Sequence, residues 1–537
     1  MSRVAAALLL AILLAGTERP LEAASGPAAT PAQVSPAEVR PARVLPAAAM
    51  SPVTARVRAY REAHEVAIVR ELAGLLGRPN VASDTENIEK SAAAVASLLE
   101  KRGIRPELLR VPGAPPVVYG ELAAPGARRT LVLYAHYDGQ PVVPAEWKGD
   151  PWSPVLRDAP VESGGRDVSL DTLRAPIPPE WRLYGRSASD DKAPVVGLLT
   201  ALDALRAGGI QPAANLKFFF EGEEEAGSPH LAEVLDRYRD KLKSDLWILF
   251  DGPVHPSRRM QVFFGARGVT DVSITLYGAT RRLHSGHYGN WAPNPTAQIA
   301  SLIASMRDPE GRITIPGFSD AVKPLGELER RALAAAPDVD EALKEELGIG
   351  RPEGNGESLI ESIQRPALNV HGITGGETGA RSTNSIPTEA TVAIDFRLVP
   401  DLTPESVRSA VESHIRARGF TILRENPDAA ARRGNVRLAK VVWGSGYPAS
   451  RTPMDLPASR AIVRVVEEAV GGSIVAQPML GGSIPMYVFR EKLGASTVGV
   501  PIANHDNNQH ASNENLRIQN LWDGIELYAG ILARMNW

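Results

Sequence analysis

Short apolar runs separated by helical patterns mark the first part of the chain as an α/β fold. Residues 130–135, 216–220 and 246–250 are largely apolar and rich in β-branched or aromatic side chains, which is typical of buried strands. Residues 91–101 carry apolar side chains at helical spacing, and residues 194–205 form an apolar, helix-like stretch. The alternation of strand and helix patterns predicts a sheet flanked by helices.

A different pattern begins near residue 268. Residues 269–276 alternate apolar and polar side chains, a helical pattern covers residues 295–306, and another strand pattern covers residues 391–399. Together they predict an α+β domain, which we call the lid, that is inserted into the α/β domain. The predicted domains are 53–266 and 404–537 for the two parts of the α/β domain and 267–403 for the lid.

Two segments are predicted to be insertions. Residues 157–180 are rich in Gly, Pro and charged side chains, which predicts a surface loop near the cleft. Residues 316–366, inside the lid, are also charged and rich in Pro and Gly, with a helical pattern near 325–335.

The N-terminus predicts export. Arg3 precedes an apolar run at 4–15 that is too short for an ordinary membrane span, and small residues follow, so residues 1–24 are predicted to be a signal peptide. An uncleaved membrane anchor is the alternative. Residues 25–52 are rich in Ala and Pro, which predicts a linker. The expected location is therefore secreted or periplasmic, with no stable membrane span after processing.

Composition narrows the possible partners and ligands. The 537 residues exceed a single usual core, so two domains are expected. A formal net charge of -3 with no basic block gives no electrostatic case for nucleic acid binding. Because the chain has no cysteine, any metal ligands must be histidine and carboxylate side chains.

Residue types that bind metals follow the predicted strands. His136-Tyr-Asp138 follows the strand at 130–135, and residues two apart on a strand face the same side, so His136 and Asp138 can act together. In an open α/β sheet, sites form beyond the carboxyl ends of the strands, where such side chains converge. Further candidates are Asp190 and Asp191 before the helical pattern at 194–205, Asp251 after the strand at 246–250, and His505, Asp506, His510 and Glu514 after a strand pattern at 496–500.

The run Glu221-Gly-Glu-Glu-Glu-Ala-Gly-Ser228 is the most informative of these motifs. It directly follows the predicted strand at 216–220. Consecutive carboxylates at the end of a buried strand are unfavourable unless protons or a polyvalent cation neutralise them. This run therefore predicts a metal site.

The motifs, taken in order, resemble a family of zinc peptidases. This family (clan MH) includes carnosinase, cytosolic dipeptidase, glutamate carboxypeptidase, aminoacylase and succinyl-diaminopimelate desuccinylase, and the resemblance spans residues 55–537. It implies a zinc-peptidase catalytic domain with a central mixed sheet and a lid that serves for dimerisation. The matching motifs are His136-x-Asp138, Gly185-Arg-x-x-x-Asp190-Asp191-Lys192, Glu224-Glu225-x-Gly227-Ser228, Asp251 and His510-x-x-Asn513-Glu514.

The resemblance also implies two zinc ions per chain, with manganese or cobalt as alternatives. Asp190 would bridge the ions, His136 and Asp251 would bind one, and Glu225 and His510 would bind the other. His505 competes with His510 as a ligand, and the trailing Asn513-Glu514 favours His510.

Catalytic and substrate-binding roles follow from the same resemblance. Glu224 would be the general base, and Asp138 would orient His136. His284 would stabilise the oxyanion from the lid of a second subunit, which implies a homodimer formed through the lid. Arg397 and the loop 481–485, with Gly482 and Ser483, would hold the substrate.

The chain departs from the family pattern at two positions: Ser187 and Ala193 replace glycines. Both residues are small, so we expect the turn to be retained. The expected function is a dizinc hydrolase that cleaves a peptide bond next to a free carboxylate, as a dipeptidase or carboxypeptidase acting on small peptides. The alternatives are an N-acyl amino acid deacylase and a non-catalytic binding module with a peptidase fold.

Overall fold

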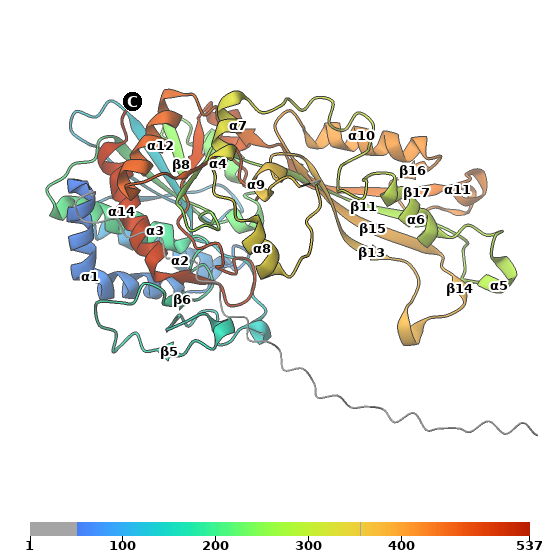
Figure 1. Cartoon of the computed structure of the whole chain (residues 1–537), viewed down its shortest axis with the longest axis horizontal. Coiled ribbons are helices and arrows are strands. Elements are labelled where there is room, and N and C mark those ends of the chain that lie inside the picture. Colours follow the sequence, from blue (N-terminus) through green and yellow to red (C-terminus); the bar gives the residue numbers. More distant parts are fainter. Residues whose placement is uncertain (1–50, 355) are drawn as a thin grey trace, which may run out of the picture. The chain divides into compact units, whose positions relative to one another are not determined.

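The structure is a computed structural model that describes residues 51–354 and 356–537 (Figure 1). In these residues the largest sheet has the strand order β1-β2-β7-β3-β8-β20-β9-β19. Strands β7, β3, β8 and β20 are parallel, β1 and β2 run antiparallel to their neighbours, and β9 is antiparallel to β20 but parallel to β19, so the sheet is mixed as predicted. The strands are β1 (Pro106–Leu109), β2 (Val117–Leu122), β3 (Thr130–His136), β7 (Asn215–Glu221), β8 (Leu246–Leu249), β9 (Gln261–Phe263), β19 (Val475–Gln477) and β20 (Thr497–Gly499).

Both faces of this sheet are buried. Along β3, Leu131 and Leu133 belong to one hydrophobic core, and Val132 and Tyr134 belong to another on the opposite face, as the two-residue period of a strand requires. The first core contains residues of helices α1 (Pro52–Leu76), α2 (Thr85–Glu100), α3 (Lys192–Ala207), α12 (Pro457–Val470) and α14 (Ile518–Arg534). The second contains residues of α4 (Leu231–Arg237) and α13 (Tyr487–Leu493).

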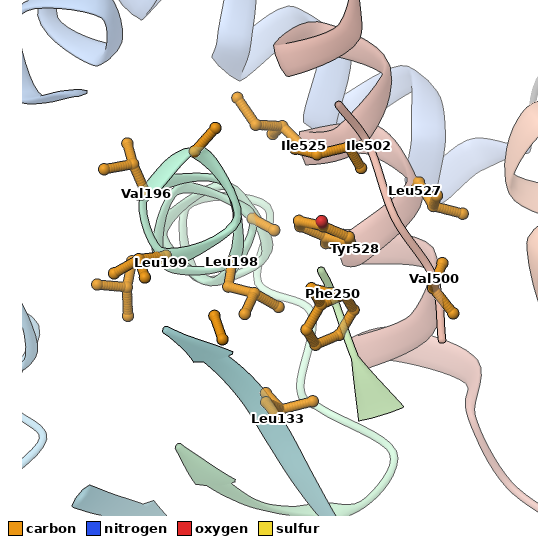
Figure 2. Close-up of a cluster of buried hydrophobic side chains, with 14 of the residues drawn as sticks. Leu133, Val196, Leu198, Leu199, Phe250, Val500, Ile502, Ile525, Leu527 and Tyr528 are labelled. Atoms are coloured by element: carbon orange, nitrogen blue, oxygen red, sulfur yellow. The ribbon is translucent and has the colours of Figure 1, made fainter. Parts of the chain in front are cut away.

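Figure 2 shows how the first core joins sheet and helices. Leu133 of β3 and Phe250, just after β8, lie beside side chains of α3 and α14. The rings of Phe250 and Tyr528 meet edge to face with centroids 4.5 Å apart. The continuous apolar runs of the sequence are explained by this burial, because their strands have no solvent-facing side.

A second sheet has the order β13-β15-β11-β17-β16. One face is covered by helices α6 (Pro295–Ala304) and α10 (Pro404–Ala417), and their apolar residues share one core with alternate residues of β11 and β15. The strands are β11 (Gly268–Tyr277), β13 (Ala367–Thr374), β15 (Glu389–Leu398), β16 (Thr421–Leu423) and β17 (Leu438–Tyr447).

This sheet corrects one predicted domain boundary. The sequence places the return to the catalytic domain at residue 404, but β17 pairs with β11 along most of its length and β16 pairs with β17. The second sheet therefore extends to Tyr447. The apolar run in β17 would suit a strand of either sheet, so the sequence pattern of β17 does not show to which sheet the strand belongs.

The remaining elements are short. The insertion 157–180 is not only a loop, because β5 inside it pairs with β4. Helix α2 begins earlier than residue 91, because Asp84 accepts a hydrogen bond from the amide of Asn87 (3.2 Å) and caps it. The short elements are β4 (Val155–Arg157), β5 (Asp167–Val168), β6 (Arg182–Tyr184), β10 (Gly265–Ala266), β12 (Leu283–His284), β14 (Ser385–Ile386), β18 (Ser450–Arg451), β21 (Asn515–Arg517), α5 (Ser285–Tyr288), α7 (Glu327–Ala334), α8 (Asp340–Leu347), α9 (Leu359–Ser362) and α11 (Ala429–Gly434).

The predicted signal peptide, residues 1–24, and the predicted linker, residues 25–52, lie outside the described residues except for Ser51 and Pro52. Ser51 caps α1 by accepting a hydrogen bond from the amide of Thr54 (3.0 Å). Among the helices of residues 51–537 that the structure describes, none is long and apolar enough to cross a membrane.

Candidate functional site

The carboxyl ends of the parallel strands carry the candidate site. His136 ends β3, Glu224 and Glu225 lie in a short 3-10 helix after β7, and Asp251 follows β8. The loop after β20 carries His510. Because neighbouring parallel strands end at the same edge of a sheet, their side chains meet there, as the sequence pattern predicts.

Two groups of ligand-type side chains form at this edge. His136, Glu224 and Asp251 bring ligand atoms within 4.8 Å of one another, and Asp190, Glu225 and His510 do the same. The first group contains Glu224, which the sequence assigns as a base rather than a ligand.

Asp190 lies between the groups. Its Oδ1 is 2.9 Å from His136 Nε2, and its Oδ2 is 3.2 Å from His510 Nε2. His510 Nε2 also lies 3.1 Å from Glu225 Oε2. One carboxylate therefore contacts a histidine of each group, which is the geometry that a bridging ligand needs.

The carboxyl groups perturb one another strongly. Burial and the charge of Asp190 raise the pKa of Asp251 to about 7, and burial and the charge of Asp251 raise the pKa of Glu224 well above its usual range. Burial alone would raise the pKa of Asp190, but its hydrogen bonds with His136 and His510 outweigh burial and lower it. Hydrogen bonds with Asp190 and Glu225 raise the pKa of His510 to about 11. The site therefore holds more buried acid than its histidines neutralise.

Asp138 fixes both sides of the cluster. Its Oδ1 lies 3.3 Å from His136 Nδ1, and its two oxygens accept hydrogen bonds from the amides of Glu224 (3.1 Å) and Glu225 (3.0 Å). The sequence predicts only its contact with His136. The contact with the 3-10 helix shows that Asp138 also positions the two glutamates.

Glu514, to which the sequence gives no role of its own, holds the turn before Asp190. Its carboxylate accepts hydrogen bonds from the amides of Ser187 (2.9 Å), Ser189 (3.0 Å) and Asp190 (3.0 Å), and from the guanidinium of Arg186 (2.9 Å). Glu514 is fully buried. Glu514 stands in the motif around His510, which indicates that it has a role. The sequence does not predict which role, because it depends on a contact between distant segments.

Ser187, which replaces a glycine of the family pattern, has φ +64°. A non-glycine residue in this left-handed region is disfavoured by about 1–2 kcal/mol, so the turn is retained with some backbone strain.

The predicted substrate residues divide into two sets. Arg397 Nη1 donates to Ser483 Oγ (2.9 Å), and Arg397 Nε donates to Asp395 (3.1 Å), so Arg397 lies against the loop of Gly482 and Ser483. His284 is exposed at the end of β12 and accepts a hydrogen bond from the amide of Gly286 (3.1 Å). Within the described single chain, no hydrogen bond or ion pair joins His284 to the other predicted site residues.

Arg267 is a further cation beside this loop, and sequence reasoning missed it. Its Nε donates to the carbonyl of Gly481 (2.9 Å), and its amide donates to the carbonyl of Gly482 (3.3 Å). Burial and the nearby charge of Arg397 lower the pKa of Arg267 to about 10. It precedes β11, at the junction of the two sheets, where a loop arginine has no distinguishing sequence pattern.

Comparison with known proteins places the chain among metallopeptidases. The model of the peptidase family M20/M25/M40 matches residues 132–534. The Cys-Gly metallodipeptidase dug1 of Schizosaccharomyces pombe is 27% identical over 459 residues, which cover 84% of this chain and 90% of that protein. The human Beta-Ala-His dipeptidase is 27% identical over 467 residues, which cover 85% of this chain and 84% of that protein.

Solved structures agree with this relationship. The M20 family metallo-carboxypeptidase Sso-CP2 of Sulfolobus solfataricus is 28% identical, with a TM-score of 0.70 over 87% of this chain and 99% of that one. Human carnosine dipeptidase 1 shares the fold, with a TM-score of 0.70 over 90% of this chain and 99% of that one, at 23% identity.

Proposed function

The chain belongs to the peptidase family M20/M25/M40 and is a metal-dependent peptidase, and we propose that it acts as a dipeptidase on peptide bonds next to a free carboxylate. The observation that carries the proposal is the position of Asp190, whose two oxygens contact His136 and His510 in two separate ligand groups. The relatives named above as dipeptidases match the chain over most of its length and support the choice of substrate class.

The side chains of the site fit a pair of divalent cations. Buried carboxyl groups with raised pKa values crowd around Asp190, and positive charge would let them ionise together. Imidazole and carboxylate groups are the ligands that zinc takes when thiolates are absent, and manganese or cobalt accept the same set. We assign Asp190 as the bridge, with His136 and Asp251 on one ion and Glu225 and His510 on the other.

When bound, such ions polarise the scissile carbonyl and lower the pKa of water. The protein side chains supply the remaining steps. We assign Glu224 to accept a proton from the attacking water and to deliver it to the leaving amine. Asp138 holds His136 on one side and the amides of Glu224 and Glu225 on the other, so it keeps the base and the ligands in register.

The substrate carboxylate is assigned to Arg397 and the Gly482-Ser483 loop. A guanidinium binds a carboxylate through two parallel hydrogen bonds, and Arg397 already lies against Ser483. We assign His284 to stabilise the oxyanion that forms in the active site of a partner subunit. This assignment requires a homodimer formed through the second sheet. The N-terminal pattern supports export of the enzyme.

A substrate and metal screen tests this function. Protein freed of metal with a chelator is reconstituted with zinc, manganese or cobalt and supplied with Cys-Gly, β-Ala-His, a dipeptide amide and N-acetyl amino acids. We expect no turnover without metal, recovery with metal, and preference for dipeptides with a free carboxylate. Preference for the N-acetyl amino acids would replace the dipeptidase by a deacylase. Full activity of metal-free protein would contradict the metal-dependent mechanism, and no hydrolysis of any substrate would favour a binding module.

A further inference from the structure

We propose that Ser187 is a positioning residue, whose hydroxyl sets the spacing between the loop that carries Asp138 and the turn that carries Asp190. The proposal rests on the function proposed above, because it assigns these two segments to one reaction centre. The hydroxyl of Ser187 hydrogen-bonds to Asn80 and to the carbonyl of Asp138, and not to a proposed metal ligand side chain or the proposed base, so its effect on the reaction is transmitted through the segments that it joins.

The hydroxyl of Ser187 takes part in two hydrogen bonds between segments that are distant in the sequence. Its Oγ accepts a hydrogen bond from Asn80 Nδ2 (2.9 Å) and donates one to the carbonyl of Asp138 (3.2 Å). Its amide donates to Glu514 (2.9 Å). Because Ser187 is fully buried, these bonds are protected from water and are not readily exchanged for solvent contacts.

Asn80 extends this link to the whole loop after β3. Its Nδ2 also donates to the carbonyl of Tyr137 (2.7 Å), and its own carbonyl accepts a hydrogen bond from the amide of Gly139 (3.1 Å). Asn80 is fully buried as well. Three consecutive residues around Asp138 are therefore held by Asn80 and Ser187 together.

The backbone of Ser187 argues that the hydroxyl has a function. At φ +64° a glycine would fit without strain, so a serine at this position is disfavoured unless its side chain stabilises the structure. The neighbouring loop has room for the hydroxyl, because a Cβ added to Gly139 would lie 2.3 Å from Ser187 Oγ. Gly139, which has no side chain, thus lies where the hydroxyl of Ser187 needs space.

Removal of the hydroxyl is expected to affect turnover more than substrate binding. Asp138 orients His136 and the amides of both glutamates, whereas the substrate carboxylate is assigned to a different loop. A shift of the Asp138 loop against the Asp190 turn therefore misplaces the base and ligands and leaves the substrate contacts unchanged. It also weakens the hold on metal, because His136 and Asp190 lie on the two segments that separate.

Two variants separate the hydroxyl from the backbone. Ser187→Gly removes the hydroxyl and relieves the strain, and Ser187→Ala removes the hydroxyl and keeps the strain. In both we expect kcat to fall by about 10–100-fold, the range for partners that orient metal ligands, with KM within twofold of wild type and faster loss of zinc to a chromophoric chelator. Ser459→Ala is the matched control. Ser459, at the start of α12, is also a buried serine whose hydroxyl donates to a backbone carbonyl, that of Pro453 (2.7 Å).

A double variant tests the link with Asn80. If Asn80 and Ser187 act as one unit, Asn80→Ala with Ser187→Gly lowers kcat no further than the stronger single variant. Wild-type kcat and zinc retention in both Ser187 variants would overturn the proposal, whatever their melting temperatures, because a purely structural role changes only stability.

The chelator assay keeps this test separate from the dipeptidase assignment. If the wild-type protein hydrolyses no dipeptide, the proposed function fails, and zinc loss from the Ser187 variants still decides the positioning role. Zinc loss at the wild-type rate would overturn it, and faster loss than in Ser459→Ala would support it.

Discussion

The two sheets bury their strands in different ways, and both groups of ligand-type side chains found in the described residues lie at the first sheet. All residues of β3 after Thr130 are buried, whereas β15 alternates buried and more accessible residues along its length. Strand β3 lies between parallel neighbours, and β15 lies between antiparallel ones. In the first sheet, functional side chains can therefore gather at the carboxyl ends of the parallel strands. In the second sheet, they can lie only on the face that the helices leave open.

This difference has a geometric cause. Neighbouring parallel strands end together, so the residues after β3, β7 and β8 are brought to one place by the fold itself. Antiparallel neighbours end at opposite edges, and the second sheet contributes single residues such as Arg397. Reaction chemistry is thus assigned to the first sheet and substrate binding to the second.

Replacement of Glu224 tests the assignment of reaction chemistry to the first sheet, and it is expected to have the largest effect on activity. Glu224→Gln keeps the shape and removes the base, so kcat should fall by about 10²–10⁴-fold while metal content stays unchanged. The matched control is Glu223→Gln, because Glu223 bonds His230 (2.9 Å) and has no assigned role. Wild-type turnover of Glu224→Gln would show that the base is misassigned, and loss of metal would show that Glu224 is a ligand.

Substitutions in neighbouring strand positions test the two modes of burial. Ile248 and Leu249 of β8 are buried in opposite cores, so replacing either by Ala should lower the free energy of unfolding by about 2–5 kcal/mol. On β11, Ile274→Ala should have a similar effect, whereas Ser273→Ala should stay within about 0.5 kcal/mol. Denaturant unfolding measures all four, and equal losses at Ile274 and Ser273 would contradict burial of only one face.

Arg397→Ala tests the substrate-binding role of the second sheet. Loss of charge-assisted hydrogen bonds to a carboxylate should raise KM by about 10–100-fold for dipeptides, with kcat little changed. Steady-state kinetics should show no such change for the dipeptide amide, which lacks the carboxylate. An equal change for both substrates would mean that Arg397 maintains the loop rather than binding the carboxylate.

Mixed variants test whether the domain that contains the second sheet supplies His284, on β12, to a partner subunit. Glu224→Gln and His284→Ala are each inactive in the shared-site arrangement, but a heterodimer has one intact site. An equal mixture that exchanges subunits should recover about a quarter of wild-type activity, since half of the dimers are mixed and each has one working site. Native mass spectrometry establishes that mixed dimers form. Their inactivity, or full activity of a monomeric wild-type protein, would rule out the shared site.

Glu221 offers a smaller, pH-dependent test of burial in the first sheet. Burial raises its pKa from an ordinary 4.5 to about 8, against the effect of its hydrogen bond from Tyr134 (2.7 Å). The folded state therefore keeps a proton that the unfolded state loses between pH 4.5 and 8. The stability of the metal-free protein should fall as pH rises through this window, by at most about 1.4 kcal/mol per pH unit from this group.

Glu221→Gln should remove this contribution and keep an acceptor for Tyr134. Denaturant midpoints of the two proteins, measured from pH 5 to pH 8, should converge at the acidic end and separate at the basic end. Parallel curves would show that Glu221 is ionised in the folded protein throughout.

The fold class was predictable because its signal lies in local patterns. The strand patterns at 130–135 and 246–250 match β3 and β8, since two buried faces impose a continuous apolar run. The boundary at residue 404 was wrong because β17 joins the second sheet through pairing with β11, which lies far away in the sequence. Strand pairing between distant segments leaves no local pattern that names the partner.

The site shows the same limit. His136, Asp190, Glu225, Asp251 and His510 stand in recognisable motifs at strand or loop positions, and the structure brings them together. Apart from Asp138, the side chains that hold these motifs were not assigned, because their contacts are purely tertiary. Asn80, for example, meets Ser187 across 107 residues and has no motif of its own.

The hydrogen bonds of Glu514 have a consequence for the order in which the protein is made. The carboxylate that fastens the amide of Asp190 lies 324 residues further along the chain, and His510 lies in the same late segment. A ribosome releases this segment after both sheets have left the exit tunnel. The nascent chain therefore presents its cluster of acids without the last histidine and without the clasp around Asp190. We therefore expect the full set of ligands to form only after synthesis of this segment, and a chain cut short before it would lack His510, Glu514 and helix α14, which packs in the first core.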